Sequence, residues 1–198
     1  MRQGLESRRM PMPLILASAS LRRAELLTSA GYEFSVEIAH VDESVLPGEL
    51  PDLYVLRVAR AKARQVSDRC RESGSAVLGA DTTVVAGGEI LGKPENAADA
   101  VRMLERLAGA VHEVLTGVVV IADGKEKAEV VTTRVHVLPI TMDEIDWYVR
   151  TGEPEGKAGG YAIQGRAARF VDRIEGSWSN VVGLPIATVA RLLQAVGA

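Results

Sequence analysis

Three long runs of β-branched and other apolar residues constrain the fold of this chain more than any other feature. They occupy residues 76–86, 111–121 and 130–138, and segments with helical spacing precede, separate and follow them. Such runs are typical of buried strands, whereas apolar residues three and four positions apart are typical of helices. Asp123-Gly124 lies between the last two runs and is a turn signal that predicts an antiparallel pair. We therefore expect an α/β protein with a mixed β-sheet and flanking helices.

The remaining elements follow from periodicity and from residues that favour helix ends. Asn96 is a predicted N-cap of a helix that ends at Gly109, and Thr141 and Glu144 have capping-box spacing. We predict strands over 14–17, 34–38 and 89–91, and helices over 22–30, 51–71, 97–108, 145–151 and 185–195.

Composition narrows the possible classes of protein. The chain has 198 residues, which is enough for one domain with a substantial core, and a formal net charge of −3. That charge opposes a general nucleic-acid or membrane-surface binder, which needs a basic excess. One cysteine, Cys70, excludes a disulfide framework, and no apolar run reaches the roughly 18 residues of a transmembrane helix. We expect a globular cytoplasmic protein.

Residues 1–12, MRQGLESRRMPM, carry charge but no apolar stretch. They are expected to form a loose tail without a secretory signal, with Met10 or Met12 as alternative starts.

Two arginines follow a loop of small residues and begin a predicted helix. Arg22 and Arg23 lie in its first turn, behind Ser18 and Ser20. Because the helix dipole makes this end positive, two cations there are unfavourable unless an anion binds. Backbone N–H groups, hydroxyls and guanidinium groups together could hold a phosphate. The alternative is that Ser20 caps the helix and that both arginines are solvated.

Two charged residues interrupt apolar patterns. Lys62 lies in the apolar stripe of helix 51–71, where an ammonium group needs a partner or a cleft. The alternative is that Lys62 reaches solvent from the edge of the stripe. Asp81 interrupts the apolar strand 76–86, which predicts a metal ligand or a general base at this position. The alternative is that Asp81 makes structural hydrogen bonds.

Further charged residues follow predicted strands. Lys93 lies in a Gly-Lys-Pro turn after the strand 89–91, and Asp42 and Glu43 follow the strand 34–38. Carboxylates of this kind suit Mg²⁺ or Mn²⁺, usually shared with substrate phosphates.

The chain resembles the Maf family of nucleoside triphosphate pyrophosphatases through motifs between about Leu14 and Pro185. In chain order these are LASASLRRAELL, ARAKA, LGADTTVV, LGKP, LxGxxHxVxTG and KAGGYAIQG…FVDRIEGSWSNVVGLP. The resemblance implies one domain over residues 13–198, with two lobes and a central cleft, similar to the inosine triphosphate pyrophosphatases. It also implies hydrolysis of a nucleoside triphosphate to the monophosphate and pyrophosphate with a divalent metal, Mg²⁺ or Mn²⁺, and makes a homodimer plausible.

The resemblance also assigns roles residue by residue. Asp81 matches the catalytic base, which deprotonates the water that attacks the α-phosphorus, and Glu43 matches an acidic position that shares the metal with Asp81. The positions that match phosphate contacts are Ser20, Arg22, Arg23, Lys62 and Lys93. The unusual placements of the cations and of Asp81 therefore converge on one expected site.

Gln164 bears on the choice of substrate. In the resembled family the branch with YAIQG acts on dTTP and UTP, and a branch with Glu at this position acts on methylated GTP. A Gln amide both donates and accepts, which suits N3–H and a carbonyl of thymine or uracil. Thr82 matches a second specificity position.

Modified pyrimidine nucleotides remain an open alternative substrate. A second function class is a nucleotide-binding regulator of septum formation, but the Asp81 base favours catalysis. No nucleic-acid or membrane partner is expected.

Overall fold

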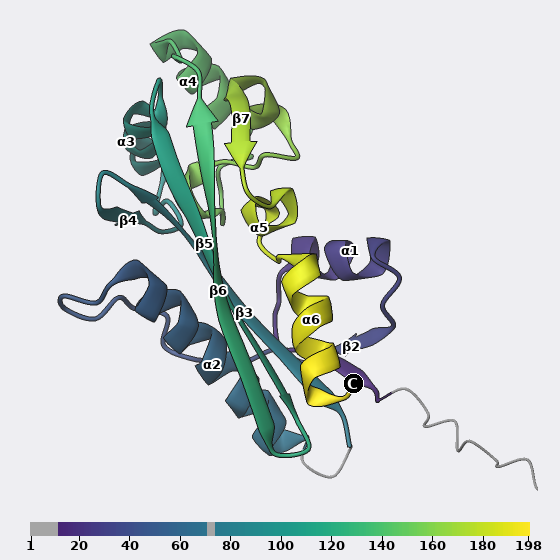
Figure 1. Ribbon diagram of the computed structural model, residues 1–198. Coiled ribbons are helices and arrows are strands. Elements are labelled where there is room, and N and C mark those ends of the chain that lie inside the picture. The colour runs from purple at the N-terminus through teal and green to yellow at the C-terminus, as the bar shows by residue number, and fades with distance from the viewer. Residues whose placement is uncertain (1–11, 71–73) are drawn as a thin grey trace, which may run out of the picture.

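The structure is a computed structural model that describes residues 12–70 and 74–198 (Figure 1). In these residues one mixed sheet has the strand order β2-β1-β3-β5-β6-β7, with β4 paired to β3. Strand β1 pairs in parallel with β2 and β3, and the other pairs are antiparallel. The strands are β1 (Leu14–Leu16), β2 (Phe34–Val36), β3 (Ala76–Ala86), β4 (Glu89–Leu91), β5 (Val111–Ala122), β6 (Lys125–Val137) and β7 (Val171–Glu175).

Helices flank this sheet, which confirms the predicted α/β class. They are α1 (Leu21–Ser29), α2 (Pro51–Arg69), α3 (Ala97–Leu107), α4 (Met142–Val149), α5 (Trp178–Val182) and α6 (Ile186–Val196). Short 3₁₀ turns occupy Ala158–Gly160 and Arg166–Phe170. In the part of the chain that the structure describes, no helix is long and apolar enough to cross a membrane.

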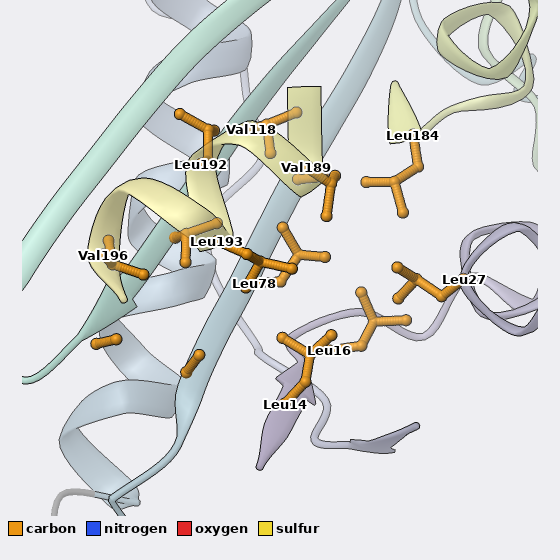
Figure 2. Close-up of a cluster of buried hydrophobic side chains, with 14 residues drawn as sticks. Leu14, Leu16, Leu27, Leu78, Val118, Leu184, Val189, Leu192, Leu193 and Val196 are labelled. Atoms are coloured by element: carbon orange, nitrogen blue, oxygen red, sulfur yellow. The ribbon is translucent and has the colours of Figure 1, made fainter. Parts of the chain in front are cut away.

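Two faces of the sheet carry different helices because side chains alternate along a strand. Leu78 and Val118 lie in a buried cluster with α1 and α6, whereas Val77 and Val119 lie in a cluster with α2. Figure 2 shows the first cluster, in which Val189 and neighbouring α6 side chains pack over β3 and β5. The two layers of helices therefore sandwich the central strands.

Strands β3, β5 and β6 are 11, 12 and 13 residues long, and they extend beyond this sandwich. At one end they pack with β1, β2, α1, α2 and α6, which we call the first lobe. At the other end they pack with β4, β7, α3 and α4, which we call the second lobe (Figure 1). The long strands are thus common to the two expected lobes.

The predicted helix caps are present. The Asn96 side chain accepts a hydrogen bond from the Asp99 N–H at 3.0 Å, at the start of α3. Thr141 and Glu144 form the predicted capping box, in which each side chain accepts from the backbone of the other residue. This box places the start of α4 at Met142, so the predicted start at 145 was wrong.

Other differences from prediction are local. Strand β6 begins at Lys125 rather than at residue 130, because the two-residue Asp123-Gly124 turn leaves the polar Lys125–Glu129 segment paired with β5. Strand β7 and helix α5 were not predicted, and each is only five residues long. The predicted tail, apart from Met12, and the predicted last residue of helix 51–71 lie outside the described residues. Met12 itself packs against the first-lobe core.

Helix α2 approaches the backbone of the sheet closely at two glycines. A Cβ at Gly79 would lie 2.8 Å from the Cβ of Ala63, and one at Gly117 would lie 2.8 Å from the Leu56 nitrogen. Asp81 pairs directly with Gly117 across β3 and β5, so this close approach lies beside Asp81. The two glycines therefore set the distance between α2 and Asp81.

We expect Gly79→Ala to lower the free energy of unfolding by about 2 kcal/mol or more, because the added methyl meets α2 backbone that cannot shift alone. Urea denaturation measures this change. The matched control is Gly92→Ala, where a Cβ meets no atom within 4 Å and should change stability by less than about 0.5 kcal/mol. Equal stabilities of the two variants would refute the packing argument.

Candidate active site

A cavity of about 970 Å³ is lined by residues of both lobes. It falls at the upper end of the size range of small-molecule sites. All nine residues to which the family resemblance gives a role line it: Ser20, Arg22, Arg23, Glu43, Lys62, Asp81, Thr82, Lys93 and Gln164. Asp42, expected beside Glu43 as a metal-binding carboxylate, is not part of the cavity wall, and its Oδ1 accepts the N–H of Ser44 at 2.8 Å. The structure thus brings together residues that are up to 144 positions apart in the chain, from Ser20 to Gln164.

Lys62 lies at the centre of an ion-pair cluster. Its Nζ is 2.7 Å from Asp81 Oδ1 and 2.7 Å from Glu43 Oε1. Lys62 is only 7% exposed, so it does not reach solvent from the edge of the apolar stripe. A buried ammonium group requires such partners, and here α2 supplies the cation while β3 supplies one carboxylate. The cluster fixes the orientation of Asp81 in the cavity wall.

Glu43 is the more accessible carboxylate of this cluster. Partial burial opposes its ionisation, but the hydrogen bond and charge of Lys62 outweigh burial and hold the pKa of Glu43 below its usual value. Lys93, whose Nζ lies 3.7 Å from Glu43 Oε2, contributes in the same direction. Glu43 is therefore ionised at neutral pH.

The carboxylates of Glu43 and Asp81 offer hard oxygen donors to the cavity. Within residues 12–70 and 74–198 no group of three or more His, Cys, Asp and Glu residues could hold a metal ion. A divalent cation here would have two protein ligands and would need oxygen atoms of water or phosphate to complete its shell. Mg²⁺ commonly binds in this way, so the donor set fits a metal that arrives with a phosphate substrate.

Arg23 is buried and directs its guanidinium group to protein acceptors. Four of its five N–H groups are engaged. They donate to Gly183 O at 2.8 Å, Ala80 O at 2.9 Å, Thr82 Oγ1 at 3.0 Å and Ser18 Oγ at 3.2 Å. Arg23 therefore ties α1 to β3 and to the turn after α5, and it offers little free donor capacity to a ligand.

Ser20 occupies the N-cap position of α1, but its side chain makes no capping hydrogen bond. Together with the burial of Arg23, this contradicts the alternative of a capped helix with two solvated arginines. The Ser20 hydroxyl and the Arg22 guanidinium both line the cavity at this helix start.

Besides Arg23 and Lys62, three cations among the described residues line the cavity: Arg22, Lys93 and Lys157. Burial lowers the pKa of Arg22, and the charge of Glu25 opposes this effect. Burial also lowers the pKa of Lys157, and the positive charge of Arg22 lowers it further. The effect of the Arg22 charge on Lys157 indicates that two positive charges lie near each other, which favours a polyanionic ligand. Lys157 was not predicted, although its position at the start of KAGG in a glycine-rich segment was an available signal.

Gln164 and Thr82 bring polar side chains of different character to the cavity. The Gln164 side chain is exposed, whereas the Thr82 hydroxyl lies 2.9 Å from Thr116 Oγ1 and 3.2 Å from Gly183 O. Gln164 is therefore free to meet a ligand, and Thr82 is held by its neighbours. Glu153 and Tyr161 also line this cavity and were not predicted.

The residues that line this cavity lie within a region shared with known proteins. Residues 13–196 match the family described as Maf-like protein. The chain belongs to the Maf family. The match covers every residue of the cavity wall named above, so the site is part of the family domain.

Relatives of this Maf-family chain share most of its length. A dTTP/UTP pyrophosphatase of Anaeromyxobacter dehalogenans (strain 2CP-C) is 55% identical over 188 residues, which cover 93% of this chain and 94% of that protein. A dTTP/UTP pyrophosphatase of Geotalea uraniireducens (strain Rf4) is 52% identical, with 93% and 95% covered.

Among solved structures, the chain is similar to the nucleoside-triphosphatase / dITP/XTP pyrophosphatase of Mycobacterium abscessus. The TM-score is 0.39 at 16% identity, over 65% of this chain and 76% of that chain. This likeness is too slight to carry an argument about the site.

His112, from the Maf-family motif in β5, supports the cavity wall from behind. It is 1% exposed, and its Nε2 lies 2.7 Å from the hydroxyl of Tyr161. Burial, with a smaller effect of His136, lowers the pKa of His112 to about 4. His112 is therefore neutral at physiological pH and makes a hydrogen bond within the protein.

The depressed pKa of His112 makes stability sensitive to acid. Between about pH 6.5 and 4 the unfolded chain binds a proton that the folded protein excludes, so stability falls as pH falls through this window. The loss from His112 between about pH 7.5 and 5 should be about 2 kcal/mol. Urea denaturation at both pH values should show that His112→Gln, which retains a partner for Tyr161, loses less stability than the wild type. The same loss in both proteins would contradict this assignment.

Proposed function

We propose that this Maf-family protein hydrolyses dTTP and UTP to the nucleoside monophosphate and pyrophosphate. The observation that carries the proposal is the union, in one cavity, of the Lys62–Asp81–Glu43 cluster with separate cations and with the exposed amide of Gln164. The carboxylates of the cluster can activate a water for attack at phosphorus, the cations can bind a triphosphate, and the amide can bind a pyrimidine. The names of the relatives support the same substrates.

Asp81 acts as the general base. Lys62 Nζ binds Asp81 Oδ1 at 2.7 Å and leaves Oδ2 to take a proton from the attacking water. Glu43 and Asp81 would hold a divalent cation, Mg²⁺ or Mn²⁺, which when bound with substrate oxygens supplies charge neutralisation at the phosphates. Lys62 orients both carboxylates, and its hydrogen bond and charge help to keep Glu43 ionised.

The remaining cations of the cavity wall stabilise the leaving pyrophosphate. Arg22, Lys93 and Lys157 line the cavity and can neutralise the charge that develops there, and Ser20 adds a hydroxyl at the start of α1. Arg23 and Lys62 were expected to contact phosphate, but their engaged donors favour positioning roles. Arg23 holds Thr82 and the carbonyl before Asp81 in place.

Gln164 recognises the base. Its amide can accept a hydrogen bond from N3–H and donate one to a ring carbonyl, a combination that thymine and uracil both match. Thr82, the second expected specificity residue, is held by Arg23 and Thr116 on the cavity wall.

Replacement of the base should separate catalysis from folding. We expect wild-type protein with Mg²⁺ or Mn²⁺ to release pyrophosphate from dTTP and UTP within a panel of nucleoside triphosphates, modified pyrimidine nucleotides included. Asp81→Asn should lower kcat at least about 100-fold, because the amide cannot take the proton. The matched control is Asp172→Asn, an exposed residue that pairs with Arg173. No release by the wild type from any nucleotide would refute the function, and equal rates in Asp81→Asn would refute only the role of Asp81.

Replacement of the amide should change the choice of base. Gln164→Glu should lower kcat/KM for dTTP and UTP by about 10- to 100-fold, because a carboxylate cannot donate to a ring carbonyl. Steady-state kinetics measure this effect, with Gln194→Glu on the exposed face of α6 as the matched control. Unchanged rates on both substrates would remove Gln164 from base recognition.

A further inference from the structure

The chain on either side of Gln164 is held by one pair of side chains, Tyr148 and Glu153. Tyr148 is fully buried on α4, and its hydroxyl donates to Glu153 Oε1 at 2.9 Å. The same hydroxyl accepts the N–H of Ala162 at 3.2 Å, two residues before Gln164. The phenol thus fixes the segment that leads into Gln164.

Glu153 fixes the segment that leaves Gln164. Its Oε2 accepts the N–H of Arg166 at 3.0 Å, and its Oε1 accepts the N–H of Ala167 at 3.3 Å. One carboxylate therefore accepts three hydrogen bonds, two of them from the backbone just beyond Gln164. An amide in its place has one acceptor oxygen, and its NH₂ group would face other donors.

Gly165 completes the arrangement because Glu153 lies against it. A Cβ at Gly165 would lie 2.5 Å from Glu153 Oε1 and 2.6 Å from Glu153 Cδ. The residue next to Gln164 must therefore lack a side chain if Glu153 is to reach the backbone beyond it.

We propose that Glu153 and Tyr148 are positioning residues that determine base specificity by holding Gln164 in place at the cavity. The proposal rests on the proposed role of Gln164 and extends it to two residues that need not touch the substrate. Burial raises the pKa of Tyr148, and the hydrogen bond to Glu153 raises it further. The phenol therefore keeps its proton and can donate it to the carboxylate.

The first test is the kinetics of Glu153→Gln. Because Gln164 binds the base in the ground state and in the transition state alike, its displacement should raise KM for dTTP about tenfold and change kcat less than about threefold. Preference for dTTP over dCTP should fall about tenfold. Tyr148→Phe, which keeps the ring but loses the hydroxyl, should change KM in the same direction by a smaller factor. A fall in kcat with KM and preference unchanged in both variants would overturn the proposal.

A double-mutant cycle tests whether Glu153 acts through Gln164. In a Gln164→Ala background, Glu153→Gln should raise KM less than about twofold, because the side chain that it positions is absent. Full additivity of the two changes would show that Glu153 acts by another route. The matched control is Glu155→Gln, an exposed acidic residue two positions away that does not line the cavity.

Hydrogen exchange gives a readout that does not depend on the substrate. The amides of Ala162, Arg166 and Ala167 should exchange about tenfold faster in Glu153→Gln than in the wild type, and at the wild-type rate in Glu155→Gln. Unchanged exchange in Glu153→Gln would overturn the proposal even if dTTP is the substrate. Absence of wild-type turnover of dTTP and UTP would instead refute the proposed function, while the exchange result would still decide the positioning role.

Discussion

Helix α2 lies against the backbone of β3 and β5, and the Lys62–Asp81 ion pair depends on that distance. Gly79 and Gly117 make the approach possible, because a Cβ at either position would overlap α2. Removing one partner of a buried ion pair costs about 3–5 kcal/mol, since the other charge remains uncompensated. The same contact that builds the first lobe therefore orients the carboxylate of the candidate active site.

The distribution of hydrogen-bond donors explains how an acidic chain can hold a polyanion. The net charge is −3, yet Arg22, Lys93 and Lys157 line one cavity. Arg23 and Lys62 are cations of a different kind, since their donors are engaged with the protein. Arg23 and Lys62 hold the cavity wall in shape, whereas Arg22, Lys93 and Lys157 present positive charge to a ligand. The Tyr148–Glu153 pair likewise makes its hydrogen bonds within the protein, and these hold the backbone on either side of Gln164.

Much of the site could be predicted because its residues disturb local patterns. Lys62 in an apolar stripe and Asp81 in an apolar strand are visible as anomalies, and the structure places both at the cavity. Glu153 disturbs no pattern, because an acidic residue in a polar loop is ordinary, so its bonds to Arg166 and Ala167 could not be predicted. Strand β7 was missed for a related reason: its five residues are too few for their alternation to be distinctive.

The kinds of elements, most of their limits and several caps can be predicted from the amino-acid sequence, because periodicity, turns and capping boxes act over a few residues. The motifs in family order also indicate which residues belong to the site. Tertiary packing determines which donors are used up within the protein and which are presented to the cavity. The hydrogen bond of Arg23 to Gly183 spans 160 positions, and no local pattern distinguishes Arg23 from Arg22. Their different roles follow from burial, which depends on how distant segments pack.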